Sequence, residues 1–210
     1  MYIKNLIAQG EHETLEFKYE VNDPRKIAKT LTAFANTKGG KLLVGVKDNG
    51  VITGISTDEE YYMVESGAKL YSKPEVEFEA KVYTEPGGKQ VLEFTVKESH
   101  RKPHCVTGKD DSEEVYVRVN DENISADKVW IKACKTKYNG IKTKYDEKHN
   151  ELLGIIEKKG PQTLISLTKK LFVSEAEIER LLVDLVASDL IAVRTSISGT
   201  LYEFNSHNHV

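Results

Sequence analysis

The sequence has few cysteines and prolines, no long apolar run and no strong excess of either charge. Its 210 residues include only 2 cysteines and 5 prolines, which excludes a disulfide-stabilised scaffold and a proline-rich extended chain. No apolar run approaches the roughly 18 residues of a membrane-spanning helix, and the N-terminal residues lack the apolar core of a secretion signal. These absences predict a cytoplasmic protein that does not enter a membrane.

The charges nearly balance. The chain has 33 acidic and 30 basic residues, for a net charge of −3, so no overall field attracts a polyanion. Any contact with nucleic acid must therefore come from local basic patches. The length suits one large domain or two small ones, with a sizeable apolar core in either case.

The first 135 residues predict an α+β domain built on a mixed sheet. Leu15 and Phe17 alternate with charged residues, which is typical of a short strand with one buried face. Asp23-Pro24 predicts the start of a helix, and Gly39-Gly40 predicts its end and a turn into an apolar strand. Two hairpins over residues 42–55 and 76–96, a strand over residues 115–119 and a helix from Ser125 to about Cys134 complete the predicted domain.

The composition changes after this domain. Residues 136–148 are rich in lysine and lack apolar periodicity, which predicts a linker. Residues 149–210 predict three short helices and a two-stranded hairpin, the last helix carrying the apolar stripe Ile178, Leu181, Leu182, Leu185 and Val186. This order is typical of a small winged helix-turn-helix domain.

A series of short motifs lies between Glu11 and Arg118. They are Glu11 with Leu15-Glu16-Phe17-Lys18, Ala33-Phe34-Ala35-Asn36-Thr37-x-Gly39-Gly40, Leu43-x-Gly45-Val46-x-Asp48, Gly54-Ile55, Lys102-Pro103 and Tyr116-Val117-Arg118. In their order and spacing, residues 1–135 resemble the Schlafen-type AlbA domain family. The resemblance implies an AlbA-like domain that binds DNA and is coupled to a C-terminal winged helix, as in bacterial transcriptional regulators.

The same resemblance implies an alternative activity. Some members of the family cut structured RNA with two glutamates and one aspartate, which map by motif position onto Glu11, Glu16 and Asp48. These three residues would then be catalytic and would bind Mg²⁺ or Mn²⁺, since hard oxygen ligands suit both ions. Without that activity they are solvated residues beside a strand and in a turn, and no cofactor is expected. The nuclease relatives form their groove from two lobes, so a single lobe predicts a homodimer.

The basic residues near these motifs are the predicted contacts to nucleic acid. They are Lys18, Lys38, Gly39, Gly40, Lys41 and Arg118 in the first domain, and Lys169, Lys170 and Arg194 in the second. The helix expected to enter the major groove, residues 174–188, contains four acidic residues, which phosphate would repel. From the family resemblance and these basic residues, we expect a DNA-binding transcriptional regulator. The alternatives are a metal-dependent endoribonuclease and a protein-docking adaptor, and the choice between DNA and RNA is open.

Overall fold

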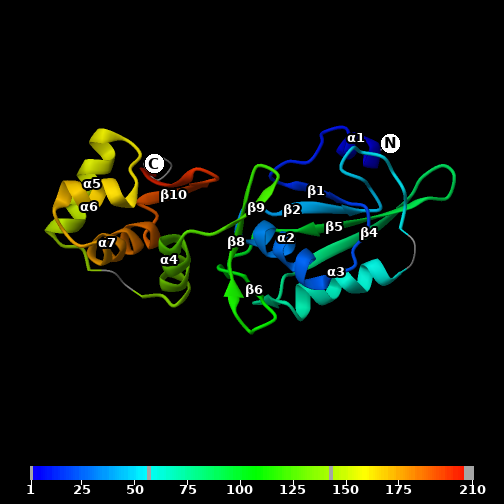
Figure 1. Cartoon of the computed structure of the whole chain (residues 1–210), viewed down its shortest axis with the longest axis horizontal. Helices are drawn as coiled ribbons and strands as arrows, with labels where there is room; N and C mark the ends of the chain where they lie inside the picture. The colour runs from blue at the N-terminus through cyan, green and yellow to red at the C-terminus, as the bar shows by residue number, and fades with distance from the viewer. Residues whose placement is uncertain (1, 56–57, 142–143, 206–210) are drawn as a thin grey trace. The chain divides into compact units, whose positions relative to one another are not determined.

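The chain divides at Ser125 into two units. A computed structural model describes residues 2–55, 58–141 and 144–205, and its first unit comprises Met1–Ser125 and its second Ala126–Val210. Figure 1 shows the order of helices and strands along the chain. None of the helices in the described part is long and apolar enough to cross a membrane.

A four-stranded mixed sheet organises the first unit. Its strands follow the order β1-β2-β5-β4, in which β1 and β2 are parallel and the other neighbours antiparallel. Their bounds are β1 Leu15–Lys18, β2 Gly40–Val44, β4 Phe78–Thr84 and β5 Gln90–Val96. The predicted α+β class with a mixed sheet is confirmed, and β4 and β5 form the second predicted hairpin.

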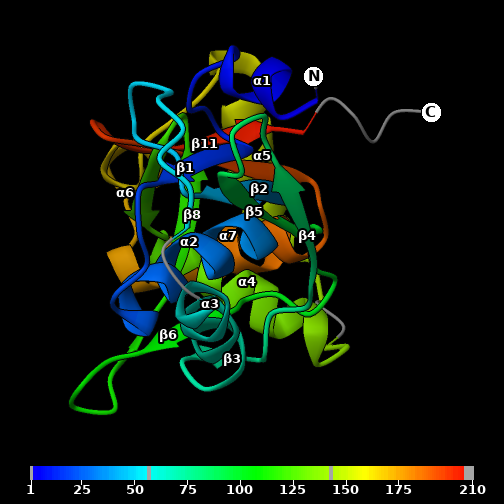
Figure 2. The ribbon, with the colours of Figure 1, turned by 90° about the vertical axis from the view of Figure 1, so that its right-hand side faces the viewer.

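Helices cover both faces of this sheet (Figure 2). The helices are α1 Tyr2–Ile7, α2 Pro24–Asn36 and α3 Glu59–Lys69. The Asp23 carboxylate caps α2 as predicted, since it accepts hydrogen bonds from the amides of Arg25 and Lys26. Phe34 of α2 is fully buried against Leu42 and Phe94, and burial of such a ring contributes about 1.5–3 kcal/mol.

Two smaller sheets complete the first unit. β3 Ser72–Lys73, β6 Cys105–Thr107 and β7 Glu113–Glu114 form one, and β8 Tyr116–Val119 pairs with β9 Glu122–Ser125 in the other. The buried Asn36 side chain joins them to α2, because its Nδ2 donates to the carbonyls of His104, at 2.8 Å, and Tyr116, at 2.9 Å. This contact fixes the start of β8 beside α2.

The hairpin predicted over residues 42–55 was wrong in its second strand. The predicted turn forms, with the Gly50 amide donating to the Lys47 carbonyl, and the Lys47 and Thr53 amides donate to the Val51 and Gly45 carbonyls. Residues 51–55 nevertheless form no continuous strand, and their pairing is an isolated bridge between Val46 and Ile52. β2 ends before Gly45, which has φ +94 and where a Cβ would lie 2.8 Å from the Gly54 carbonyl carbon. β2 pairs instead with β1 and β5, which bury both of its edges.

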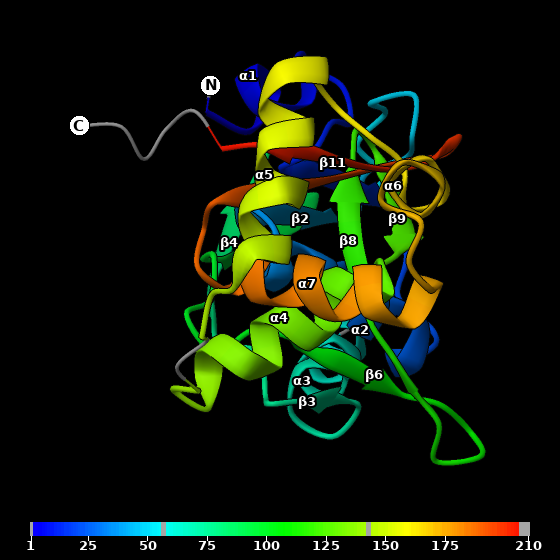
Figure 3. The same cartoon turned by 90° about the vertical axis from the view of Figure 1, so that its left-hand side faces the viewer.

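Helices and one hairpin form the second unit (Figure 3). Its elements are α4 Lys128–Tyr138, α5 Glu147–Lys159, α6 Leu164–Leu171, α7 Glu175–Ala187, β10 Ile191–Ser196 and β11 Gly199–Phe204. The predicted apolar stripe of α7 is buried at Ile178, Leu181, Leu182 and Leu185.

The helix α4 begins later and belongs to a different unit than the sequence predicted. Asp127, not Ser125, caps it by accepting from the amides of Val129 and Trp130. Val129 is fully buried in the core that includes Leu181 of α7, so the helix lies within the second unit rather than the first. The predicted linker over residues 136–148 is correspondingly shortened, with residues 142 and 143 outside the described part of the chain.

Candidate nucleic-acid interface

The carboxylate of Glu16 is buried within the sheet. Glu16 lies on β1, on the face covered by α2, and is only 6% exposed. One of its oxygens accepts from Lys18 Nζ, and the other accepts from the Arg118 guanidinium at 2.8 Å. Both oxygens are therefore engaged by cations of the same chain.

Arg118 holds this arrangement together. Its guanidinium also donates to Asn123 Oδ1 at 3.0 Å and to the His12 carbonyl at 3.1 Å, and it lies 5.1 Å from the centre of the Phe34 ring. The side chain is 0% exposed. The structure thus places this predicted nucleic-acid contact in the interior, where it neutralises Glu16.

Glu11 lies close enough to Glu16 and Asp48 for their charges to interact. Glu11 Oε1 accepts from the Phe17 amide at 2.8 Å. Burial raises the pKa of Glu11, the Phe17 hydrogen bond opposes this, and the negative charges of Glu16 and Asp48 raise it further. Asp48 itself is exposed, in the turn after β2. The three predicted carboxylates therefore share one region of the first unit.

The raised pKa of Glu11 gives a testable pH dependence. The folded state binds this proton more tightly than the unfolded state, so its stabilising effect is complete below the unfolded pKa of 4.5 and is lost as the pH rises through the folded value. We expect Glu11→Gln to remove this dependence. Urea unfolding of both forms at a series of pH values should give a difference in unfolding free energy that shifts in favour of the wild type on acidification. A difference that is independent of pH would contradict this expectation.

The carboxylates do not fit a divalent cation as they are arranged. Glu16 has both oxygens paired with cations, and Glu11 already accepts from a backbone amide. Among the residues that the structure describes, no group of three or more histidine, cysteine, aspartate or glutamate side chains is placed to hold a metal ion. A metal ligand needs lone pairs directed at one point, and each oxygen of Glu16 instead directs one lone pair at a cation of the chain.

The two predicted lysine contacts around the Gly-Gly turn each form an ion pair with a glutamate of the same unit. Lys38 Nζ donates to Glu13 at 2.8 Å, and Lys41 Nζ donates to Glu93 at 2.9 Å. Gly39 has φ +74, and a Cβ on it would meet the Val96 carbonyl at 2.6 Å, while a Cβ on Gly40 would meet the Phe34 ring at 2.5 Å. Close packing against the protein therefore accounts for both glycines.

Two residues that the sequence analysis did not select lie beside the charged group. Lys47 Nζ lies 5.4 Å from the centre of the Tyr19 ring, and Tyr19 is 50% exposed. The Lys18 carbonyl accepts from the amides of Gly45 and Val46, which brings these two segments together. In the sequence, neither Tyr19 nor Lys47 is distinctive without this contact. Lys18, Tyr19 and Lys47 form what we call the strand-end cluster.

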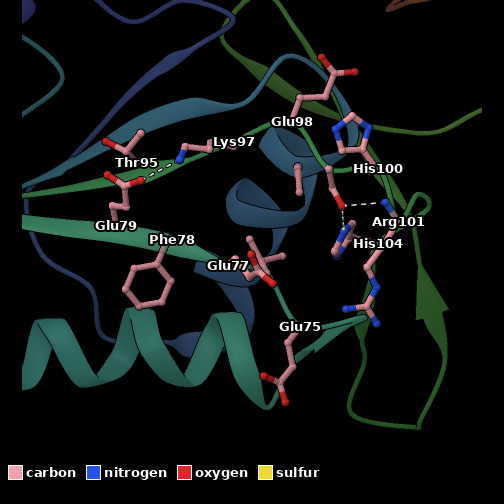
Figure 4. A pocket seen from close by; sticks show the side chains of 13 residues that line it. Glu75, Glu77, Phe78, Glu79, Thr95, Lys97, Glu98, His100, Arg101 and His104 are labelled. Carbon is pink, nitrogen blue, oxygen red and sulfur yellow. Dashed lines mark hydrogen bonds and ion pairs between the residues drawn. The ribbon is translucent and has the colours of Figure 1, made fainter.

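A separate cavity of about 420 Å³ lies at the other end of the sheet (Figure 4). His104 on its wall is buried, with Nδ1 2.8 Å from the Pro74 carbonyl and Nε2 2.7 Å from Ser99 Oγ. A carbonyl only accepts, so Nδ1 carries the proton and the Ser99 hydroxyl donates to Nε2. Burial lowers the pKa of His104, in agreement with a neutral ring that fixes this loop. Acidic and basic side chains mix along the cavity, so it is not a basic groove.

The predicted contacts of the second unit differ in accessibility. Lys169 is exposed, Lys170 donates to Gln162 Oε1, and Arg194 on β10 pairs with Glu203 at 2.9 Å. These three residues come from α6 and from the hairpin.

Lysines of α4 and α5 neutralise the acidic face of α7. Lys128 pairs with Glu175 at 3.1 Å and with Glu179 at 2.6 Å. Lys132 also pairs with Glu179, and Lys148 pairs with Glu177. Lys148, which lies in the predicted linker, is thus held on the folded unit, and the repulsion expected between α7 and phosphate is reduced.

The first unit is an α+β domain in which a charged group of side chains lies at one end of a mixed sheet. Its sequence matches the family Schlafen, AlbA_2 over residues 11–127, more than half of the chain. The chain belongs to this family, which suggests a function related to nucleic acids. No curated protein matches the chain in sequence.

One solved structure resembles the whole chain loosely. It is the crystal structure of the DIP2311 protein from Corynebacterium diphtheriae, with 18% sequence identity and a TM-score of 0.45. The match covers 93% of this chain and 36% of that protein, so the chain corresponds to about a third of its length.

Proposed function

We propose that this chain is a nucleic-acid-binding protein of the cytoplasm, a DNA-binding transcriptional regulator, whose first unit contacts the phosphate backbone through the strand-end cluster. The observation that carries the proposal is the placing of Lys47 against the half-exposed ring of Tyr19 at the end of the parallel strands. Cations supply backbone affinity, and exposed aromatic rings stack on bases. Membership of the family supports the same class of ligand.

In this proposal the buried carboxylate has a structural role. Glu16 receives Arg118 on one side and Lys18 on the other. The pair fixes Lys18 at the surface end of β1, where its side chain is 38% exposed. Because the carboxylates do not fit a divalent cation, we propose binding without hydrolysis.

The second unit supports the proposal through the order of its elements. Three helices followed by the β10–β11 hairpin match the order of a winged helix-turn-helix domain. With α7 neutralised by neighbouring lysines, we propose that Lys169 and the hairpin residue Arg194 add backbone contacts. Specificity then comes from the shape of the nucleic acid more than from base edges.

A binding experiment tests this function. Fluorescence anisotropy with duplex DNA, single-stranded DNA and structured RNA should show affinity that falls steeply with salt. We expect Lys47→Ala to lower the slope of log K against log salt by about 1, as for one lost phosphate contact. Tyr19→Ala should cost about 1–3 kcal/mol on a strand with unstacked bases.

Matched measurements separate the alternatives. Lys69→Ala removes an exposed lysine at the end of α3, paired with Glu65, and should leave the slope of log K against log salt unchanged.

Cleavage of RNA with Mn²⁺ or Mg²⁺ that is lost in Glu11→Gln would establish the nuclease instead. Absence of binding to all three polymers at low salt would overturn the proposal and favour a protein-docking adaptor.

A further inference from the structure

The outer edge of β4 is uncovered in the first unit. β4 is the last strand in the order β1-β2-β5-β4, and within the described residues no strand pairs with its outer edge. Residues 79–82 are exposed, with Val82 57% exposed. An open edge of this kind presents unpaired backbone groups that can pair with another strand.

The hydrogen bonds at the hairpin turn show which backbone groups face this edge. The Glu85 amide donates to the Lys89 carbonyl at 2.8 Å, so bonding to β5 alternates from that position and involves the odd-numbered residues of β4. The Ile55 amide bonds to the Gln90 carbonyl from the opposite side of β5, which agrees with this alternation because Gln90 lies opposite Thr84. Residues 78, 80, 82 and 84 therefore direct their amides and carbonyls outward.

We propose that two copies of this chain associate through antiparallel pairing of their β4 strands about a two-fold axis at Ala80. In this register Ala80 lies opposite the partner's Ala80, and both residues have outward backbone groups, as a hydrogen-bonded pair requires. Glu79 then lies opposite the partner's Lys81, and Phe78 lies opposite the partner's Val82. The two four-stranded sheets become one continuous sheet.

Charge selects this register over its neighbours. A two-fold axis at Phe78 would place Glu77 opposite Glu79, and an axis at Val82 would place Glu79 opposite Glu85. Like charges directly opposite each other are destabilising, whereas Glu–Lys pairs are favourable. The axis at Ala80 forms two Glu–Lys pairs on one face and two Phe–Val contacts on the other.

The ion pair that Glu79 forms within its own chain competes only weakly with the proposed pairing across the dimer. Glu79 pairs with Lys97 at 2.8 Å, but the two side chains are 60% and 81% exposed, and such pairs contribute little in water. The dimer is independent of the proposed nucleic-acid function, since β4 carries none of the strand-end cluster.

Charge reversal and its compensation test the dimer. Analytical ultracentrifugation of the wild-type chain over a range of concentrations should show a monomer–dimer equilibrium. Glu79→Lys or Lys81→Glu alone should weaken it by about tenfold or more, because each change replaces two attractive pairs with two repulsive ones. The double variant Glu79→Lys/Lys81→Glu should restore the dimer, since the opposed charges are again complementary.

Cysteine cross-linking tests the position of the axis. Ala80→Cys should form an intermolecular disulfide under mild oxidation, because opposed residues of a hydrogen-bonded pair have Cα atoms about 5.5 Å apart. Thr84→Cys lies far from its copy in this register and should not cross-link faster than the wild type. A wild-type chain that is monomeric at millimolar concentration, or a dimer unaffected by either charge reversal, would overturn the proposal.

Discussion

Replacing Arg118 with alanine should lower the free energy of unfolding of the first unit by about 3–5 kcal/mol, the usual cost of leaving a buried charge without its partner. The guanidinium is wholly buried and contacts Glu16, Asn123 and the His12 carbonyl. Its loss would leave Glu16 buried beside only one cation. Native-state hydrogen exchange of the β1 and β2 amides measures this change in the full chain, where the two units need not unfold together.

A double variant separates the charge from the packing. Arg118→Met combined with Glu16→Leu removes both charges while filling much of the same space, and apolar replacements of buried pairs are often close to neutral. We expect the double variant to lose less stability than Arg118→Ala alone. If Arg118→Ala costs less than about 1 kcal/mol, the typical value for an exposed pair, the buried role of Arg118 is wrong.

Gly39→Ala should destabilise the first unit by about 2–5 kcal/mol, from a left-handed backbone that costs about 1–2 kcal/mol and overpacking that costs about 1–3 kcal/mol. The residue has φ +74, and its added Cβ would lie 2.6 Å from the Val96 carbonyl and 2.9 Å from the Glu98 amide nitrogen. Both contacts are backbone atoms of β5 and the segment that follows it, which cannot turn aside as a side chain can. The measurement is again hydrogen exchange in β2 and β5.

Gly10 provides the matched control. It has φ +71, nearly the same as Gly39, but a Cβ there would meet nothing within 4 Å. Gly10→Ala should therefore cost only the backbone term, about 1–2 kcal/mol. Equal losses in the two variants would show that close packing at Gly39 contributes nothing, and the glycine would then be free for another role.

Local signals in the sequence predicted several elements correctly. The Asp23-Pro24 pair begins α2 because a side-chain acceptor and a fixed φ act over only a few residues. The stripe from Ile178 to Leu185 is buried as its helical spacing predicted. The hairpin of β4 and β5 formed for the same reason, since alternation and turn residues are local properties.

Elements that depend on distant partners were predicted less well. Gly45 follows β2 and is approached closely by the backbone of Gly54, which no local pattern indicates. Asp127 rather than Ser125 begins α4, and the buried Val129 assigns that helix to the second unit. Lys148 lies in the stretch predicted to be a solvated linker, but it pairs with Glu177 of α7.

The candidate site shows the same division. Motif order located Glu11, Glu16 and Asp48, and the structure brings them into one region. Arg118 was predicted to contact nucleic acid, but it lies more than 100 residues after Glu16 in the chain and is its buried partner. Tyr19 and Lys47 were overlooked because neither is distinctive without the contact between them.

The amino-acid order alone determined the family, the α+β class and the helices with strong caps or stripes, because those depend on neighbouring residues. Only the tertiary structure decided which charged side chains are buried in ion pairs and which are exposed to solvent. An ion pair across a hundred residues forms when strands become neighbours, and burial then makes it a structural contact. The open edge of β4 likewise exists only once the strand order of the sheet is known.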